Sequence, residues 1–146
     1  KPGGIFVRSG DQIPNEDRVL MQTVARVIIR DELGTDVPLH FTAFHPDYKL
    51  DDIPSTPLET LIQARKIALD CGLQYVYTGN VHHREGDTTF CHACGNIAIE
   101  RDWYEIKRYD LTTEGCCKRC NALIPGSFGA FSGQFGRQRM PVRIGM

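Results

Sequence analysis

Long apolar runs and an excess of charge of either sign are both missing from this 146-residue sequence. No run approaches the roughly 18 apolar residues of a membrane-spanning helix, so we expect no transmembrane segment. The first residues, KPGGIFVRSGDQIP, contain no apolar stretch of the signal-peptide kind. The formal net charge is −1, which gives the chain no overall attraction to nucleic acid or anionic membranes. We therefore expect a cytoplasmic protein with no membrane partner, and the balanced charge does not favour a nucleic-acid partner.

Cysteine is also too sparse for a disulfide scaffold, with six residues in 146. In a reducing cytosol, regularly spaced cysteine pairs bind metals more often than they form disulfides. The length of 146 residues suits one domain, or one domain plus a small appendage, and 41% apolar residues are enough for its core. The chain has no initiator methionine and opens in the middle of a motif, so we expect a fragment of a longer protein.

The first eighty residues alternate short apolar runs, typical of β-strands, with segments of helical spacing. Strands are expected at residues 4–8, 38–44 and 75–79, and helices between Asn15 and Gly34 and between Thr56 and Gly72. In the first helix Leu20, Val24, Val27 and Ile28 form the apolar face. The second begins with Thr56-Pro57-Leu58-Glu59, which matches a capping box. The order βαβαβ predicts an α/β fold with parallel strands and right-handed crossovers.

Polar residues follow each of these strands. The clusters are Ser9-Gly10-Asp11, His45-Pro46-Asp47 and Asn80-Val81-His82. The carboxyl ends of parallel strands meet at one edge, where such sheets bind ligands. Ordinary turn chemistry also explains residues of these types, and both interpretations stay open. The candidate ligand-binding residues are Ser9, Gly10, His45, Asp47 and Asn80.

Two Cys-x-x-Cys pairs dominate the last sixty residues. They are Cys91–Cys94 and Cys117–Cys120, with 22 residues between them. Gly95 and Asn121 follow the pairs, and both residue types tolerate the positive φ that closes a tight turn. The sequence between the pairs predicts a hairpin. Two such turns joined by a hairpin are typical of a zinc ribbon with a structural Cys₄ zinc ion.

Other interpretations of the cysteines exist. The pairs would be free thiols or a redox Cys-x-x-Cys, or the four ligands would hold iron. Cys116 adjoins a ligand and would compete with it, but the symmetric spacing favours Cys117. Cys71 lies on the apolar side of a helix and is expected to be a small buried hydrophobe.

The end of the chain, SFGAFSGQFGRQRMPVRIGM, alternates phenylalanine with glycine and carries three arginines. Stacking aromatics and arginines would suit a nucleic-acid contact. A strap that packs its phenylalanines on the domain is the interpretation we prefer, because the overall charge is balanced and three arginines are few.

Several stretches together resemble the AmmeMemoRadiSam-system radical SAM enzymes, relatives of the pyruvate formate-lyase activating enzymes. They are VPLHFTAFHPDYKL, LQYVYTGNVHH, the double Cys-x-x-Cys around IERDWYEI, and IPGSF with PVRI. The resemblance covers nearly the whole chain. It implies a partial β/α barrel that binds S-adenosylmethionine on a [4Fe-4S] cluster, followed by a zinc-ribbon-like lobe. It also implies that His45 lies near the ribose of S-adenosylmethionine.

The cluster-binding motif of such enzymes, C-x-x-x-C-x-x-C, is missing from this chain. Ser9 also stands where the family pattern has proline. The resemblance therefore implies the carboxy-terminal half of such an enzyme, with no catalytic residue of its own. It implies as partners the amino-terminal half and the Memo-like and AMMECR-like proteins of the system. The rival class is a non-catalytic zinc-ribbon adaptor that docks a protein or an RNA.

The expected architecture follows from these parts. Residues 1–86 would form the half barrel, 87–127 the zinc-ribbon-like lobe, and 128–146 the tail. The metal ligands would be Cys91, Cys94, Cys117 and Cys120, and the metal zinc.

Overall fold

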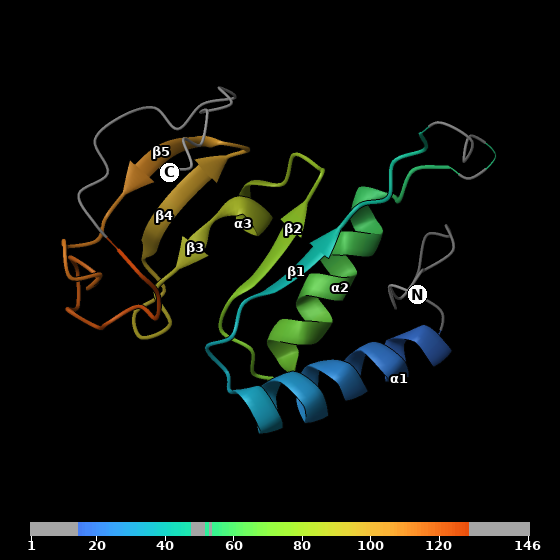
Figure 1. Cartoon of the computed structure of the whole chain (residues 1–146), viewed down its shortest axis with the longest axis horizontal. Coiled ribbons are helices and arrows are strands. Elements are labelled where there is room, and N and C mark those ends of the chain that lie inside the picture. Colours follow the sequence, from blue (N-terminus) through green and yellow to red (C-terminus); the bar gives the residue numbers. More distant parts are fainter. Residues whose placement is uncertain (1–14, 48–51, 53, 129–146) are drawn as a thin grey trace, which may run out of the picture.

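The computed structural model describes residues 15–47, 52 and 54–128. Figure 1 shows two helices beside a pair of strands, and a second sheet farther along the chain. The expected strand at 4–8, the candidate residues Ser9 and Gly10, and the tail from residue 129 lie outside the described residues. No helix in the described part is long and apolar enough to cross a membrane.

The first helix, α1 (Asn15–Thr23), continues without a break into a π-helical segment, η1 (Val24–Leu33). It ends at Gly34, whose φ is 111° and whose N–H donates to the carbonyl of Ile29 at 2.8 Å. The predicted apolar face is wrong in part, because Leu20, Val27 and Ile28 are 46–48% exposed. Met21 and Ala25 are buried instead. A π-helical turn spans five residues between hydrogen-bonded groups, so it shifts which side chains face the core.

Strands β1 (Leu39–Thr42) and β2 (Val76–Gly79) pair in parallel, with helix α2 (Leu58–Asp70) between them in the chain. This arrangement confirms the predicted α/β unit. Phe41 on β1 packs against buried residues of both helices, including Met21 and Ile67, so the helices cover one face of the pair. In the part of the chain that the structure describes, this sheet has two strands and forms no closed barrel.

Thr56 ties the start of α2 to the end of β1 and does not cap the helix. Its Oγ1 accepts the N–H of Phe44 at 3.0 Å, and its own N–H donates to the Phe44 carbonyl at 3.0 Å. The helix begins at Leu58, and no side-chain hydrogen bond caps it at Pro57. The predicted capping box is therefore wrong, because the threonine hydroxyl already accepts the N–H of Phe44, just beyond β1.

The short helix α3 (Arg84–Asp87) connects β2 to an antiparallel sheet. That sheet has the order β3 (Thr89–Phe90), β4 (Ile97–Asp102), β5 (Glu105–Tyr109). A turn at Trp103 and Tyr104 joins β4 to β5, which confirms the predicted hairpin. Trp103 has a φ of 54°, which is uncommon for a bulky residue.

One apolar cluster joins the two sheets. Tyr75, at the start of β2, is buried together with Ile99 of β4 and with two of the paired cysteines, Cys91 and Cys117. Helix α3 also packs between β2 and β4. The cysteine-bearing lobe therefore shares its core with the parallel strands.

Candidate metal centre

Each Cys-x-x-Cys pair forms a tight turn, and the two turns have the same backbone pattern. In the first, the N–H of Gly95 donates to the carbonyl of Cys91 at 2.9 Å, and in the second Asn121 donates to Cys117 at 2.8 Å. Gly95 and Asn121 have φ values of 67° and 61°. These left-handed residues confirm the prediction drawn from the residue types that follow each pair.

A second hydrogen bond closes each turn in the reverse direction. The N–H of Cys91 donates to the carbonyl of Asn96 at 2.8 Å, and that of Cys117 donates to Ala122 at 2.9 Å. Both turns are therefore closed by hydrogen bonds of their own backbone.

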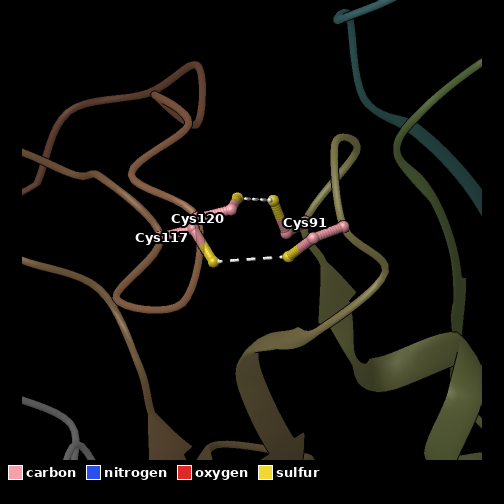
Figure 2. Close-up of side chains that lie close together, drawn as sticks. Cys91, Cys117 and Cys120 are labelled. Carbon is pink, nitrogen blue, oxygen red and sulfur yellow. Dashed lines mark hydrogen bonds between the residues drawn. The ribbon is translucent and has the colours of Figure 1, made fainter.

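The two turns face each other, and their four sulfur atoms lie within 4.8 Å of one another. The Sγ atoms of Cys91 and Cys120, which point toward each other in Figure 2, are 3.6 Å apart. Those of Cys94 and Cys117 are 3.8 Å apart. Cys91 and Cys117 are buried, whereas Cys120 is exposed. This geometry is that of a four-cysteine metal-binding site, as the spacing of the pairs predicted.

The protein backbone already favours a thiolate at one of the four positions. Hydrogen bonds from the backbone N–H groups of Cys120 and Arg119 lower the pKa of Cys117 to about 7. At Cys120, the backbone N–H of Ala122 lowers the pKa, but the thiols of Cys94 and Cys91 and the loss of water outweigh it and raise the pKa to about 12. Four thiolates this close repel one another, so a bound cation is what allows all four to ionise.

The remaining cysteines stay outside the site. Cys116 donates its N–H to the Thr112 hydroxyl at 3.1 Å, and its sulfur is not one of the four that converge. Cys71 is buried in an apolar cluster with Ala68 and Val76. Both outcomes agree with the roles expected from the sequence.

The structure brings the ends of β1 and β2 together, as the parallel order requires. Thr42 pairs with Gly79, and Asn80 reaches back to donate to the carbonyl of Ala43 at 3.3 Å. His45 lies two residues beyond Ala43, is exposed, and has its Nδ1 3.2 Å from the Ser55 hydroxyl. Asp47 is exposed farther along the same loop.

The residues FTAFH alternate, so Phe41, Ala43 and His45 would share one face, and His45 would lie above a barrel interior if Phe41 and Ala43 pointed inward. Phe41 instead packs on the helices, so His40 and Thr42 occupy the opposite face of β1. The condition for His45 to lie above an interior face is therefore not met, and its contact with S-adenosylmethionine stays a prediction.

A groove of about 610 Å³ lies on the face of β1 and β2 opposite the helices. Of the predicted ligand residues, Asn80 lines it and His45 does not. His40, Tyr77, Arg101, Trp103 and Phe128 also line it. These five come from four separate segments, so no local motif could have identified them together.

Comparison with curated proteins identifies a relative of this chain. It is the "Uncharacterized protein MJ0808" of Methanocaldococcus jannaschii, which is 53% identical over 97 residues. The matched region is 66% of this chain but only 29% of that protein's length. No family model matches the chain, and no solved structure matches it.

Proposed function

We propose that this chain binds one structural zinc ion through Cys91, Cys94, Cys117 and Cys120, as the non-catalytic docking lobe of a longer protein. The main support for a bound metal ion is the distance between the sulfur atoms, 3.6 Å in one pair and 3.8 Å in the other. Four sulfurs about 2.3 Å from a central zinc ion form a tetrahedron with edges of about 3.8 Å. In a four-iron cluster each thiolate binds a different iron atom, so the sulfurs stand farther apart than around one ion.

A structural role follows from the ligand set. Four protein ligands fill a tetrahedral zinc ion and leave no position for a substrate or an activated water. The buried sulfurs of Cys91 and Cys117 belong to the same apolar cluster as Tyr75. An ion at this point would join the turn between β3 and β4 to the turn that follows β5, in a lobe with few other buried side chains.

The exposed apolar residues of α1 and η1 support a docking role. Val19, Leu20, Val27 and Ile28 are 46–62% exposed on a helix whose other side is buried. The relative described above is more than three times as long as the matched segment. We assign this helical face to contacts with the rest of such a longer protein. A protein partner suits the face better than RNA, because the chain carries a net charge of −1.

Metal analysis of matched variants tests the zinc proposal. The purified chain should contain about one zinc per chain, and Cys94→Ser should lose it. Cys116→Ser removes a neighbouring thiol outside the site and should keep the metal. Full zinc retention in Cys94→Ser would contradict the ligand set.

A split-protein experiment tests the docking role. The chain should co-purify with the remaining segments of its longer protein when both are expressed together. Replacing both Leu20 and Ile28 by aspartate should abolish this association while zinc content stays unchanged. Association that survives the double substitution would remove α1 and η1 from the interface.

We also propose that the longer protein is a radical SAM enzyme, in which this chain is the carboxy-terminal part. The support is the resemblance of the quoted motifs and the parallel β1–β2 pair with its helical connection. This chain has no C-x-x-x-C-x-x-C motif to hold the [4Fe-4S] cluster, so we derive no catalytic step from its residues. An upstream C-x-x-x-C-x-x-C in the encoding reading frame, together with iron and sulfide in the full-length product, would support the proposal. A full-length product with neither would refute it.

A further inference from the structure

We propose that the groove opposite the helices is a binding site for a small planar carboxylate, which Arg101 recognises. The proposal does not depend on which metal the cysteines hold. It rests on the size of the groove, on the state of one cationic side chain, and on the aromatic residues around it.

The size of the groove suits a small molecule. Its volume, about 610 Å³, lies within the range of roughly 300–1,000 Å³ found for ligand pockets. The β1–β2 pair forms one wall, β4 and the hairpin turn form another, and Ile124–Phe128 forms the third. The last wall is anchored by Phe128, whose ring lies so close to Gly115 that a Cβ there would be 2.2 Å from it.

Arg101 brings a positive charge into this groove, and neither of the two carboxylates that also line it, Asp36 and Asp87, forms an ion pair with Arg101. The side chain is half-buried, its Nη1 donates to the Asp87 carbonyl at 3.0 Å, and its Nη2 donates to the Thr89 hydroxyl at 2.9 Å. Among the described residues it takes part in no ion pair, although Arg84 and Arg108 each pair with a carboxylate. A guanidinium has five N–H donors, so these two acceptors leave others for a ligand.

The Tyr77 ring supports the Arg101 guanidinium. Its carbon lies 5.6 Å from the centre of the Tyr77 ring, within the range of a cation–π contact. The Tyr77 hydroxyl is 3.0 Å from the Thr89 hydroxyl, and the ring lies 4.9 Å from that of His40. A cation that is oriented before binding loses little freedom when a ligand arrives.

The aromatic side chains around Arg101 indicate that the ligand is flat as well as negatively charged. Trp103 and Phe128 line the groove in addition to Tyr77. The Trp103 indole N–H donates to the His82 ring at 2.9 Å, which fixes the indole at the groove. Arginine binds carboxylates through two parallel hydrogen bonds, and aromatic rings favour a flat partner. A planar ring bearing one carboxylate combines these two features.

Benzoate and benzamide are matched probes for this site, because they differ mainly in charge. Trp103 is the sole tryptophan of the chain, so its fluorescence reports on the groove without labelling. Benzoate should change the fluorescence of the metal-loaded chain in a saturable way, with an affinity about tenfold higher than that of benzamide. Equal affinities for the two probes would overturn the proposal.

Arg101→Gln should remove the preference for benzoate, whereas Arg108→Gln, the same change outside the groove, should keep it. If Arg101→Gln fails to fold, shifts of backbone amide NMR signals in the unsubstituted chain decide the matter. Benzoate should shift signals of Tyr77, Arg101 and Trp103, and shifts confined to other regions would refute the site. A preference for benzoate that survives in folded Arg101→Gln would refute it equally.

Discussion

The sulfur atoms of Cys91 and Cys120 lie 3.6 Å apart although the two residues are 29 positions apart in the chain. The two residues belong to different turns, and the hairpin of β4 and β5 lies between those turns in the chain. A contact this close between non-local thiols, repeated at 3.8 Å by Cys94 and Cys117, places a metal-binding site at the junction of the turns.

Loss of one ligand should destabilise the lobe far more than the βα unit. In Cys94→Ser, amide hydrogen exchange across residues 88–127 should become faster, while exchange in α2 should change little. A structural zinc site contributes on the order of 10 kcal/mol of binding free energy, so the effect should exceed that of ordinary core substitutions. The control, Cys116→Ser, should exchange like the unsubstituted chain. Equally accelerated amide exchange in α2 and in residues 88–127 would show that the metal stabilises both parts alike and would contradict this prediction.

Gly115→Ala and Gly95→Ala should differ in cost although both glycines have positive φ. The φ values are 82° and 67°, so each substitution strains the backbone by about 1 kcal/mol. A Cβ on Gly95 meets nothing within 4 Å, whereas one on Gly115 would lie 2.2 Å from the Phe128 ring. Gly115→Ala should therefore lower the free energy of unfolding by about 1–3 kcal/mol more, as measured by denaturant unfolding.

The double variant Gly115→Ala/Phe128→Ala provides the control for this comparison. Removing the ring should make the added methyl group cost no more than it costs at Gly95. If the two alanine substitutions are equally destabilising in the unsubstituted background, Phe128 does not pack on Gly115 in solution.

The free energy of unfolding should fall in alkaline solution because the phenol of Tyr75 ionises. Burial and the nearby Tyr77 raise the pKa of Tyr75 from 10.0 to about 12. Because the folded protein keeps the phenol neutral, Tyr75 stabilises the fold fully below pH 10, and this contribution is lost as the pH rises from 10 to about 12. Unfolding followed across that window should show the decline. Tyr75→Phe should reduce the slope, and an unchanged slope in that variant would assign the effect to another group.

The chain by itself should not cleave S-adenosylmethionine. It lacks the cysteine motif that would hold a [4Fe-4S] cluster, so no electron can reach the sulfonium. After incubation with iron, sulfide and dithionite, chromatography should detect no 5′-deoxyadenosine. Turnover at the rate of a complete radical SAM enzyme would show that this chain is sufficient and would refute its assignment as a carboxy-terminal part.

The metal site could be predicted from the sequence because its determinants are local. Each turn depends on two cysteines and on a glycine or asparagine with positive φ, all within five residues. The β1–β2 pair was predictable for a related reason, since short apolar runs and an intervening helix define a parallel unit. Non-local contacts determine the features that the sequence did not predict. Thr56 bonds to Phe44 rather than capping α2, and the π-helical turn of η1 shifts the buried side to Met21 and Ala25.

The groove could not be predicted from the sequence, because non-local contacts form it as well. Its cation, Arg101, lies between Glu100 and Asp102 near the end of β4 and resembles any surface arginine in the sequence. Only the fold shows that the Arg101 guanidinium lies over Tyr77 and has no carboxylate partner among the described residues. Long-range packing thus creates the site from residues that are individually ordinary.

X-ray absorption at the zinc edge of the purified chain tests the central claim most directly. It measures the identity, number and distance of the atoms that bind the metal. The account predicts four sulfur ligands at about 2.3 Å and no nitrogen or oxygen neighbour. A chain purified without zinc, or one whose zinc binds fewer than four sulfurs, would contradict it.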